Sequence, residues 1–171
     1  MGEVVIQSVS LGRALVLTIS DSASAGKRED LSGPEAMRIL QEAGFDVAPV
    51  EILPDERAPI ESRLRRASEE DFRLVVTSGG TGLSPRDVTP EATLAVIDRQ
   101  APGIAELMRL ESFKITPRAA LSRAAAGIRQ ATLIINLPGS VKGVRECLAA
   151  VRPILPHAVE VLKQSSLGCG E

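Results

Sequence analysis

One glycine-rich segment of this sequence has the composition of an anion-binding loop. It reads Thr77-Ser-Gly-Gly-Thr-Gly82 and directly follows a short apolar run. Its glycines permit backbone conformations that other residues avoid, so successive amide N–H groups can converge on a phosphate. Ser78 and Thr81 add hydroxyl donors, and Arg86 adds a positive charge. The segment matches neither standard nucleotide motif, because no Lys-Ser/Thr pair follows as in a P-loop and Pro85 stands where a dinucleotide motif has its third glycine. Its composition nevertheless favours a phosphate-binding loop over a plain turn.

Two aspartates could bring a divalent cation to such an anion. Asp87 precedes Thr89, where a helix is expected to begin, and Asp55 follows Pro54 at the end of an apolar run. Each has a simple structural interpretation, because acidic residues stabilise helix N-termini and aspartate is common in turns. Mg²⁺, however, prefers one or two carboxylates together with substrate oxygens. As a pair at the ends of two strands of one sheet, Asp55 and Asp87 favour a site.

A second anion site is predicted at Pro138-Gly-Ser140. This segment is typical of a strand-to-helix turn in which Ser140 caps the helix, and capping alone accounts for the serine. Lys142 is harder to explain, because a cation in the first turn of a helix opposes the helix dipole. A bound anion would resolve that conflict.

Histidine and cysteine contribute little to this chemistry. His157 is the only histidine and lies beyond every loop considered above, so it is interpreted as a surface or packing residue. Cys147 falls on an apolar helix face and Cys169 in a polar tail, which favours free thiols in a reducing compartment over a disulfide. Ser-His and Cys-His nucleophiles and a histidine-rich zinc site are therefore disfavoured.

The elements that must position these residues alternate between strands and helices. Near-continuous apolar runs predict buried strands, and helical spacing of apolar residues predicts the helices between them. Ser32-Gly-Pro-Glu35 has the form of a capping box, and Thr89 is expected to cap a later helix. The alternation predicts an α/β three-layer sandwich, with a mostly parallel central sheet covered by helices on both faces and ligands at the carboxyl ends of the strands. Strands are expected at 14–19, 45–53, 74–76 and 132–137, and helices after residue 32, around 60–67, after residue 89, at 102–112 and from residue 140 onward, with breaks at Pro153 and Pro156.

Composition limits the function further. The 171 residues suit one compact domain, and 20 basic against 22 acidic side chains lack the basic excess of a dedicated nucleic-acid binder. We recognise no signal peptide and no apolar stretch of membrane-spanning length, so a cytoplasmic protein without membrane or nucleic-acid partners is expected.

The charge is unevenly distributed along the chain. Residues 101–153 hold 8 basic and 3 acidic side chains. Arg109, Arg118, Arg123 and Lys142 in this stretch either face polyanionic ligands or lie on solvated helix faces and subunit contacts. The only aromatic residues are three Phe, so a bound ring would rest on glycine backbone, aliphatic side chains and arginine planes.

Several segments occur together in an order that is characteristic of one enzyme family. The longest is Thr77-Ser-Gly-Gly-Thr-Gly-Leu-Ser-Pro-Arg-Asp-Val-Thr-Pro-Glu-Ala92. In these motifs the chain resembles the molybdopterin adenylyltransferases of molybdenum-cofactor biosynthesis, the MogA/MoaB group that includes the G domain of gephyrin. The resemblance extends from about residue 14 to residue 162. The other matching segments are Ile19-Ser-Asp21 with Gly26, Ile52-Leu-Pro-Asp-Glu56, Pro102-Gly-Ile-Ala-Glu-Leu-Met-Arg109, Leu121-Ser-Arg123 and Ile135-Asn-Leu-Pro-Gly139.

This resemblance implies a three-layer α/β domain that uses ATP, Mg²⁺ and molybdopterin. The phosphate of molybdopterin attacks the α-phosphorus of ATP, which gives adenylylated molybdopterin and pyrophosphate. Asp55 and Asp87 match the two critical aspartates of the family and are expected to act in catalysis and to hold the metal. The implied substrate-binding residues are Ser20, Asp21, Ser78, Gly79, Gly80, Thr81, Gly82, Pro138, Gly139, Ser140 and Lys142.

The resemblance also implies an assembly and a domain division. Members are usually trimeric, so a homotrimer is expected, with a hexamer as the alternative, and a transient contact with the molybdate-insertion protein. Residues 14–163 are expected to form the single molybdopterin-binding domain, between an N-terminal extension at 1–13 and a C-terminal tail at 164–171. Val141 stands where members often carry proline, which bears on subclass more than on fold.

Two other functions stay open beside the adenylyltransferase. One is a catalytically silent, molybdopterin-binding paralogue, although the presence of both Asp55 and Asp87 favours an enzyme. The other is a hydrolase acting on a nucleotide-like diphosphate, for which the sequence offers no identifiable water-positioning group.

Overall fold

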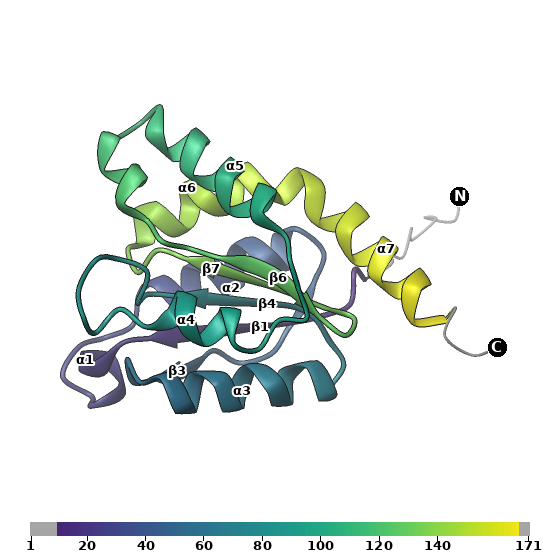
Figure 1. Cartoon of the computed structure of the whole chain (residues 1–171), viewed down its shortest axis with the longest axis horizontal. Helices are drawn as coiled ribbons and strands as arrows, with labels where there is room; N and C mark the ends of the chain where they lie inside the picture. The colour runs from purple at the N-terminus through teal and green to yellow at the C-terminus, as the bar shows by residue number, and fades with distance from the viewer. Residues whose placement is uncertain (1–9, 168–171) are drawn as a thin grey trace, which may run out of the picture.

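A single mixed sheet of seven strands forms the centre of the computed structural model, which describes residues 10–167 (Figure 1). The strands are β1 (Arg13–Ile19), β2 (Asp46–Val47), β3 (Glu51–Leu53), β4 (Phe72–Ser78), β5 (Arg99–Gln100), β6 (Ala126–Arg129) and β7 (Thr132–Leu137). Their order is β2-β1-β4-β7-β6-β5, and β3 also pairs with β1. β1, β2, β3, β4 and β7 are parallel, whereas β6 pairs antiparallel with β7 and β5 antiparallel with β6.

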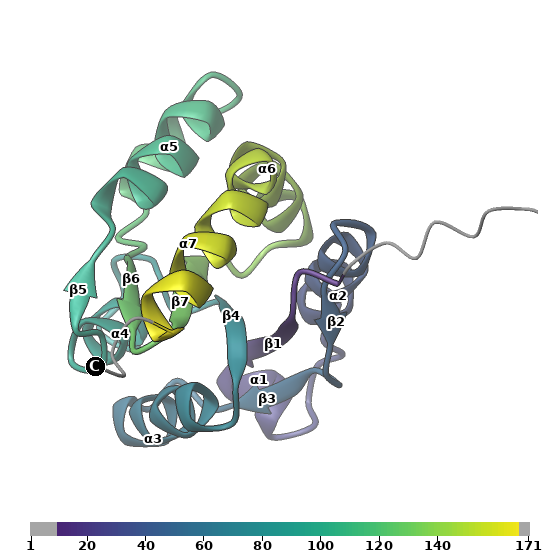
Figure 2. The same cartoon turned by 90° about the vertical axis from the view of Figure 1, so that its right-hand side faces the viewer.

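Helices cover both faces of this sheet. They are α1 (Asp21–Ser24), α2 (Ser32–Glu42), α3 (Arg57–Glu69), α4 (Thr89–Leu94), α5 (Pro102–Phe113), α6 (Val141–Val151) and α7 (Leu155–Leu167), with 3₁₀ turns η1 (Pro117–Leu121) and η2 (Arg152–Ile154). In the part of the chain described, α2, α5, α6 and α7 pack on one face, and α3 and α4 pack on the other (Figure 2). The predicted three-layer α/β sandwich is thereby confirmed.

The two hydrophobic cores follow from the alternation of side chains along each strand. In β1, Ala14 and Val16 join the core under α2, α5, α6 and α7, whereas Leu15 and Leu17 join the core under α3 and α4. All four are fully buried. Because both faces of a parallel strand are covered, its sequence is continuously apolar rather than alternating, and this is the pattern from which the strand was predicted.

Two strand predictions need correction. The single strand expected at 45–53 is two short strands, β2 and β3, separated by 48–50, and both pair with β1. Pro49 lies in this gap, where it lacks the N–H that a continuous ladder would need. β5 and β6 were not predicted, because β5 is an exposed pair of residues at the sheet edge and β6 is only four residues long.

Helix capping is only partly as predicted. Ser140 does cap α6, where its Oγ accepts a hydrogen bond from the N–H of Gly143 at 3.1 Å. The capping box at residues 32–35 is wrong: the carboxylate of Asp30 accepts from the N–H groups of Ser32 and Gly33, while Glu35 forms ion pairs with arginines. Thr89 is also wrong as a cap, because it is the first helical residue and its N–H donates to the carbonyl of Gly80.

The remaining predictions concern single residues and the chain ends. Cys147 is a buried free thiol of the core beside α5, and His157 is exposed on α7. Cys169 lies outside the described residues. β1 begins at Arg13 and α7 continues to Leu167, and the domain division at 14–163 stays a prediction.

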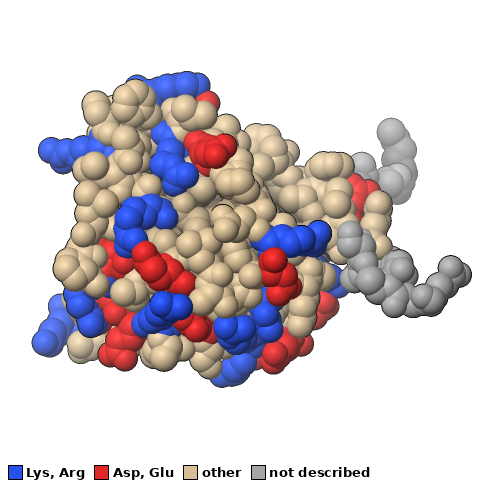
Figure 3. Space-filling view, viewed as in Figure 1, with Lys and Arg blue, Asp and Glu red and all other residues tan. Residues whose placement is uncertain are grey.

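The charged side chains on the surface agree with the balanced net charge of the sequence. On the face seen in Figure 3, basic and acidic side chains are interleaved around α3, where ion pairs such as Arg57–Glu61 and Arg66–Glu70 form. This face therefore lacks a continuous basic surface. Of the helices in residues 10–167, none combines the length and the apolar composition needed to cross a bilayer.

Candidate functional site

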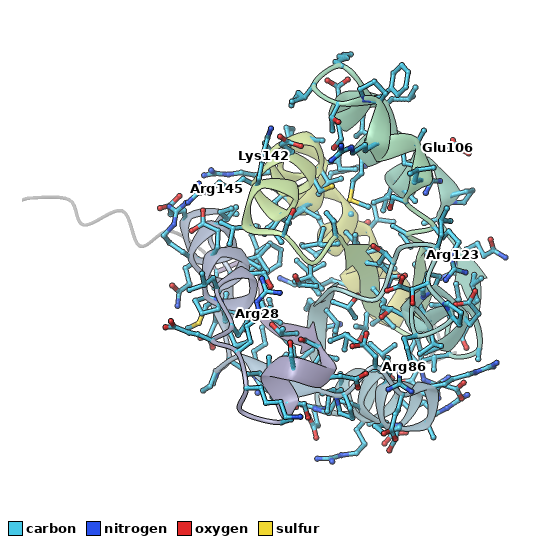
Figure 4. All side chains as sticks on the ribbon, turned by 90° about the vertical axis from the view of Figure 1, so that its left-hand side faces the viewer. Arg28, Arg86, Glu106, Arg123, Lys142 and Arg145 are labelled. Atoms are coloured by element: carbon cyan, nitrogen blue, oxygen red, sulfur yellow. The ribbon has the colours of Figure 1, made fainter. Side chains whose placement is uncertain are left out.

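Four loops meet at one edge of the sheet because four parallel strands end there. β1, β3, β4 and β7 are followed by Ser20, by Pro54-Asp55, by the glycine-rich loop (residues 79–87) and by Pro138-Gly-Ser140. Figure 4 looks onto this side of the molecule, with Arg28, Arg86, Arg123 and Lys142 labelled around it. The strand-end rule therefore brings together loops that are up to 118 residues apart in the chain.

Two adjacent pockets open at this edge. The smaller pocket has a volume of about 340 Å³ and the larger pocket about 400 Å³, and Ser140 lines both of them. Consecutive residues of two loops divide between them: Gly79 and Gly80 line the smaller pocket, Thr81 and Gly82 the larger. Of the predicted site residues, the smaller pocket is lined by Ser20, Asp55, Ser78, Gly79, Gly80, Asp87, Gly139 and Ser140, and the larger by Thr81, Gly82, Pro138, Ser140 and Lys142.

Asp21 lines neither pocket and instead holds Asp55 in place. The two aspartates form a reciprocal pair: the N–H of Asp21 donates to Oδ2 of Asp55 at 2.8 Å, and the N–H of Asp55 donates to Oδ1 of Asp21 at 3.0 Å. Arg86 binds the Asp21 carboxylate through Nε and Nη2, at 3.1 and 2.7 Å from Oδ2. The positive charge predicted for anion binding at Arg86 is therefore engaged by an internal carboxylate.

These contacts give the two aspartates opposite pKa shifts. The hydrogen bond from Arg86 lowers the pKa of Asp21 below its ordinary value. The pKa of Asp55 is raised, mainly because the carboxyl group is half-buried, and the negative charges of Asp21 and Asp87 raise it further. Since Asp87 repels the ionised Asp55, a cation between the two carboxylates would be favoured electrostatically.

Asp87 is fixed by a tight turn in the glycine-rich loop. Its Oδ2 accepts a hydrogen bond from the N–H of Ser84 at 2.8 Å, and its own N–H donates to the carbonyl of Ser84 at 2.9 Å. A Cβ atom added to Gly82 would lie 2.9 Å from the same Oδ2. The absence of a side chain at residue 82 therefore leaves room for the Asp87 carboxylate.

The first two glycines of the loop are required by close approach and by backbone conformation. Gly79 has φ +110°, and a Cβ atom there would lie 2.2 Å from the carbonyl oxygen of Ile19. Gly80 has φ +66°, and its Cβ would lie 2.2 Å from Oγ1 of Thr89 and 3.2 Å from Oδ1 of Asp55. That Thr89 hydroxyl is buried and has no hydrogen-bond partner within the described residues. Glycine thus allows the loop to pass beside an unsatisfied donor and a carboxylate.

The larger pocket combines apolar walls with cations. Ala105, Met108, Leu121 and Cys147 contribute apolar surface, and burial raises the pKa of the Cys147 thiol. The cationic side chains are Arg109, Arg118 and Lys142. Arg109 also donates to the carbonyl of Ala124 at 2.9 Å, and Nζ of Lys142 lies 3.7 Å from Oε1 of Glu146. The Glu146 carboxylate therefore offsets part of the unfavourable charge that Lys142 places at the start of α6.

The residues of the smaller pocket fit a divalent cation that is shared with a substrate. Within residues 10–167, no group of three or more His, Cys, Asp or Glu side chains could hold a metal by itself. Asp55 and Asp87 supply two carboxylates, and the glycine-rich loop leaves space beside both. Mg²⁺ commonly uses one or two carboxylates and completes its shell with water and phosphate oxygens, so this donor set suits it.

The sequence interpretation missed several residues of the smaller pocket. Arg28, Glu29 and Asp30 line it, and none of the three was among the predicted site residues. Arg28 is the cation among its lining residues. Its signal was a basic side chain in the polar segment that follows the first predicted strand, and only the path of the chain between α1 and α2 brings it to the pocket.

Comparison with known proteins identifies the family to which this arrangement belongs. The family described as "Probable molybdopterin binding domain" matches residues 15–157, which include every loop of both pockets. The chain belongs to this family. The fold and the motif resemblance therefore lead to the same molybdopterin-binding domain.

Relatives within the molybdopterin-binding domain family are similar over most of their length. The molybdopterin adenylyltransferase of Helicobacter pylori J99 is 47% identical over 162 residues, which cover 92% of this chain and 89% of that protein. The molybdopterin adenylyltransferase of Escherichia coli K12 is 44% identical over 140 residues, covering 80% of this chain and 72% of that protein. The crystal structure of the molybdopterin biosynthesis enzyme MoaB from Thermus thermophilus is 50% identical, with a TM-score of 0.84 over 89% of this chain and 96% of that one.

Proposed function

We propose that this protein transfers the adenylyl group of Mg-ATP to the phosphate of molybdopterin, forming adenylylated molybdopterin and pyrophosphate. The observation that carries the proposal is the pair of pockets that share Ser140, with Asp55 and Asp87 beside one of them. Two substrates held in adjacent pockets bring an attacking phosphate and the α-phosphorus of ATP together, and positioning supplies much of the catalysis of phosphoryl transfer. Relatives named molybdopterin adenylyltransferase, at 47% and 44% identity, support the same reaction.

The smaller pocket is proposed to bind the phosphates of ATP. Asp55 and Asp87 would hold Mg²⁺, which supplies charge neutralisation for the triphosphate and for the departing pyrophosphate. The backbone N–H of Gly80 and the guanidinium of Arg28 would bind phosphate oxygens directly, whereas the N–H of Gly79 already donates to the carbonyl of Leu137 at 3.1 Å. Asp21 and Arg86 would act only by holding Asp55.

The larger pocket is proposed to bind molybdopterin. Its apolar wall suits a pterin ring, and Arg109, Arg118 and Lys142 suit the phosphate. A phosphate oxygen is already ionised near neutral pH, so the nucleophile needs no general base. This is consistent with the position of His157, which is exposed on α7 and lines neither pocket.

The assay that tests this function combines the protein with molybdopterin and Mg-ATP and measures both products. Stoichiometric pyrophosphate and adenylylated molybdopterin are expected. Asp55→Asn and Asp87→Asn should lower kcat by about 100-fold or more, because each removes a metal-binding charge. Asp46→Asn, which changes an exposed aspartate of β2, should leave kcat within twofold of the wild type.

The same assay distinguishes the adenylyltransferase from the other two functions, the catalytically silent paralogue and the hydrolase. Molybdopterin binding without turnover would indicate the catalytically silent paralogue, and AMP released without adenylylated pterin would indicate the hydrolase. Wild-type rates in both Asp55→Asn and Asp87→Asn would contradict the assigned roles of the aspartates.

The proposal also includes the oligomeric state of the enzyme, its cellular location and its protein partner. The homotrimer, its hexamer alternative and the transient contact with the molybdate-insertion protein remain predictions from the sequence resemblance, and the cytoplasmic location remains a prediction from the composition of the sequence. Light scattering on the purified protein measures the first two, and a mass of three chains is expected.

A further inference from the structure

Arg123 holds the glycine-rich loop of the site without lining either pocket. It lies between η1 and β6, and its backbone N–H donates to the carbonyl of Thr81 at 2.9 Å. Its guanidinium Nε donates to the carbonyl of Gly82 at 2.7 Å. The two terminal nitrogens donate to the carbonyl of Asp87 and to Oε1 of Glu91. The side chain therefore binds the middle and the end of the glycine-rich loop and the helix that follows it.

These bonds determine where the Asp87 carboxylate lies. The turn between Ser84 and Asp87 fixes the carboxylate relative to its own loop, through Oδ2 and the backbone N–H. The guanidinium of Arg123 donates to the carbonyl of Asp87, and this hydrogen bond joins Asp87 to the chain segment after η1. Thr81 and Gly82 line the larger pocket and Asp87 the smaller, so the same side chain fixes the walls of both.

The ion pair with Glu91 holds the guanidinium in this orientation. Burial opposes ionisation of Glu91, but the hydrogen bond from Arg123, a backbone hydrogen bond and the charges of Arg123 and Arg57 together outweigh it, so the pKa of Glu91 lies below its ordinary value. A planar guanidinium can bind three carbonyl or carboxylate oxygens in different directions, which a lysine ammonium on a flexible stem reproduces poorly. The geometry is thus specific to arginine.

We propose that Arg123 is a positioning residue that fixes Asp87 and the glycine-rich loop in the orientation needed for adenylyl transfer. This inference rests on the proposed function. Because Arg123 lies behind the loop, its loss would disturb alignment of the reacting groups more than substrate binding. Misalignment lowers kcat, while KM reports mainly the ground state.

Arg129 offers a matched control. It also extends from the β6 region, and its guanidinium donates to Oγ of Ser68 at 3.1 Å and to the carbonyl of Val96 at 3.2 Å. It contacts neither the glycine-rich loop nor a pocket-lining residue in these bonds. Arg129→Ala therefore removes a comparable set of structural bonds away from the site.

The first experiment compares Arg123→Ala, Arg123→Lys and Arg129→Ala at a temperature at which all three are folded. Arg123→Ala should lower kcat by about 30- to 100-fold, with KM for each substrate within about threefold, and guanidinium ion at millimolar concentration should restore part of the loss. Arg123→Lys should remain at least about tenfold impaired. Arg129→Ala should keep kcat within twofold. A kcat for Arg123→Ala equal to that of Arg129→Ala would overturn the proposal.

The second experiment does not depend on the reaction. Amide hydrogen exchange of residues 79–88 should accelerate at least about tenfold in Arg123→Ala and stay unchanged in Arg129→Ala, because only the first releases the loop. Glu91→Gln, which keeps the shape of its side chain, should give a smaller acceleration. Unchanged exchange in both Arg123→Ala and Glu91→Gln would overturn the positioning role. An inactive wild type with accelerated exchange in Arg123→Ala would instead contradict the adenylyltransferase function alone.

Discussion

At the scale of single residues, the electrostatics of the site depend on Asp21, which binds both Arg86 and Asp55. Arg86 neutralises Asp21, and Asp21 in turn fixes Asp55 through two reciprocal hydrogen bonds. Asp55 remains exposed to the charge of Asp87, and its pKa is raised by burial and by these negative neighbours. The sequence identified Asp55 but not its dependence on Arg86, because the two residues are 31 positions apart and meet only through a third side chain.

A pH dependence follows from this arrangement. An aspartate has an ordinary pKa of about 4, so the raised pKa of Asp55 predicts that kcat/KM for Mg-ATP falls with decreasing pH at a higher pH than an ordinary aspartate would cause. Arg86 lowers the pKa of Asp55. Arg86→Ala should therefore raise that pKa further and move the acid limb of the profile to higher pH. Profiles measured between pH 4.5 and 8 would show the shift.

Substrate titration does not confuse this comparison, because ATP is the same in every profile. Arg38→Ala is the control, since Arg38 forms exposed ion pairs with Glu35 and Glu42 on α2. Its profile should coincide with that of the wild type. An acid limb that stays in place in Arg86→Ala would exclude the proposed link to Asp55.

Asn136 is a second residue whose importance is local. It is fully buried in β7, where its Nδ2 donates to Oγ1 of Thr77 at 3.1 Å and Oγ1 of Thr93 at 2.8 Å. Its Oδ1 accepts from the N–H of Ala125 at 3.1 Å. The amide thereby joins β7 to β4, α4 and the segment before β6.

Replacing this amide should be costly to stability. Asn136→Leu leaves the half-buried N–H of Ala125 and the hydroxyls of two buried threonines without their partner, and we expect a loss of about 2–4 kcal/mol in the free energy of unfolding. Ile135→Val, at the neighbouring buried position, should cost about 1 kcal/mol. Urea unfolding measures both. A loss in Asn136→Leu no larger than that in Ile135→Val would contradict the expected cost of unpaired groups.

At the scale of elements, strands buried on both faces were the easiest to predict. β1, β4 and β7 are largely apolar because helices cover both of their faces, and such runs are visible without any knowledge of neighbours. β5 and β6 lacked that signal, because they lie at the edge of the sheet and are stabilised by pairing in space. Short edge strands of this kind have no distinctive local pattern.

Helix starts were harder to predict because several polar residues compete for the same N–H groups. Before α2, Asp30 and Ser32 are both capping residues by type, and the chain path selects Asp30. The same carboxylate accepts from Oγ1 of Thr18 at 2.6 Å, a bond to β1 that no local motif contains. Tertiary contact thus decides between candidates that the sequence leaves equivalent.

This assignment predicts an unequal effect of two substitutions at the start of α2. Asp30→Ala removes the cap of Ser32 and Gly33 together with the bond to Thr18, and should cost about 1–2 kcal/mol of unfolding free energy. Ser32→Ala removes a single hydroxyl donor to Asp30 and should cost about 0.5 kcal/mol. Urea unfolding of the two variants distinguishes them. A larger loss in Ser32→Ala would restore the capping box as the correct description.

At the scale of the whole molecule, the location of the site at one edge of the sheet was predictable, but its division into two pockets was not. Parallel strands place their carboxyl ends together, so the four loops could be assigned to one site from the order of elements alone. The split into two pockets depends on side-chain packing between α5, η1 and α6, about which the motifs say nothing. The basic stretch at 101–153 shows the same limit: Arg109 and Arg118 line the larger pocket, whereas Arg123 binds the loop from behind.

The shared wall of the pockets leads to a prediction about ligand binding. Adenylylated molybdopterin joins the groups that the two pockets are proposed to hold, and Ser140 borders both pockets, so one molecule can occupy both without a long bridge. Linking two ligands makes the second binding event intramolecular. The product should therefore bind at least about 100-fold more tightly than AMP or molybdopterin alone, as measured by titration calorimetry.

Two variants, one in each pocket, test whether the product occupies both pockets at once. Arg28 lines the smaller pocket and Arg118 the larger, and both side chains are exposed, so neither substitution should disturb the fold. Arg28→Ala should weaken AMP and the product but not molybdopterin, and Arg118→Ala should weaken molybdopterin and the product but not AMP. If the product bound no more tightly than the better single ligand, or responded to only one variant, the two pockets could not be the two halves of one site. A product sensitive to both variants requires that they are occupied together, which is the arrangement that adenylyl transfer between them needs.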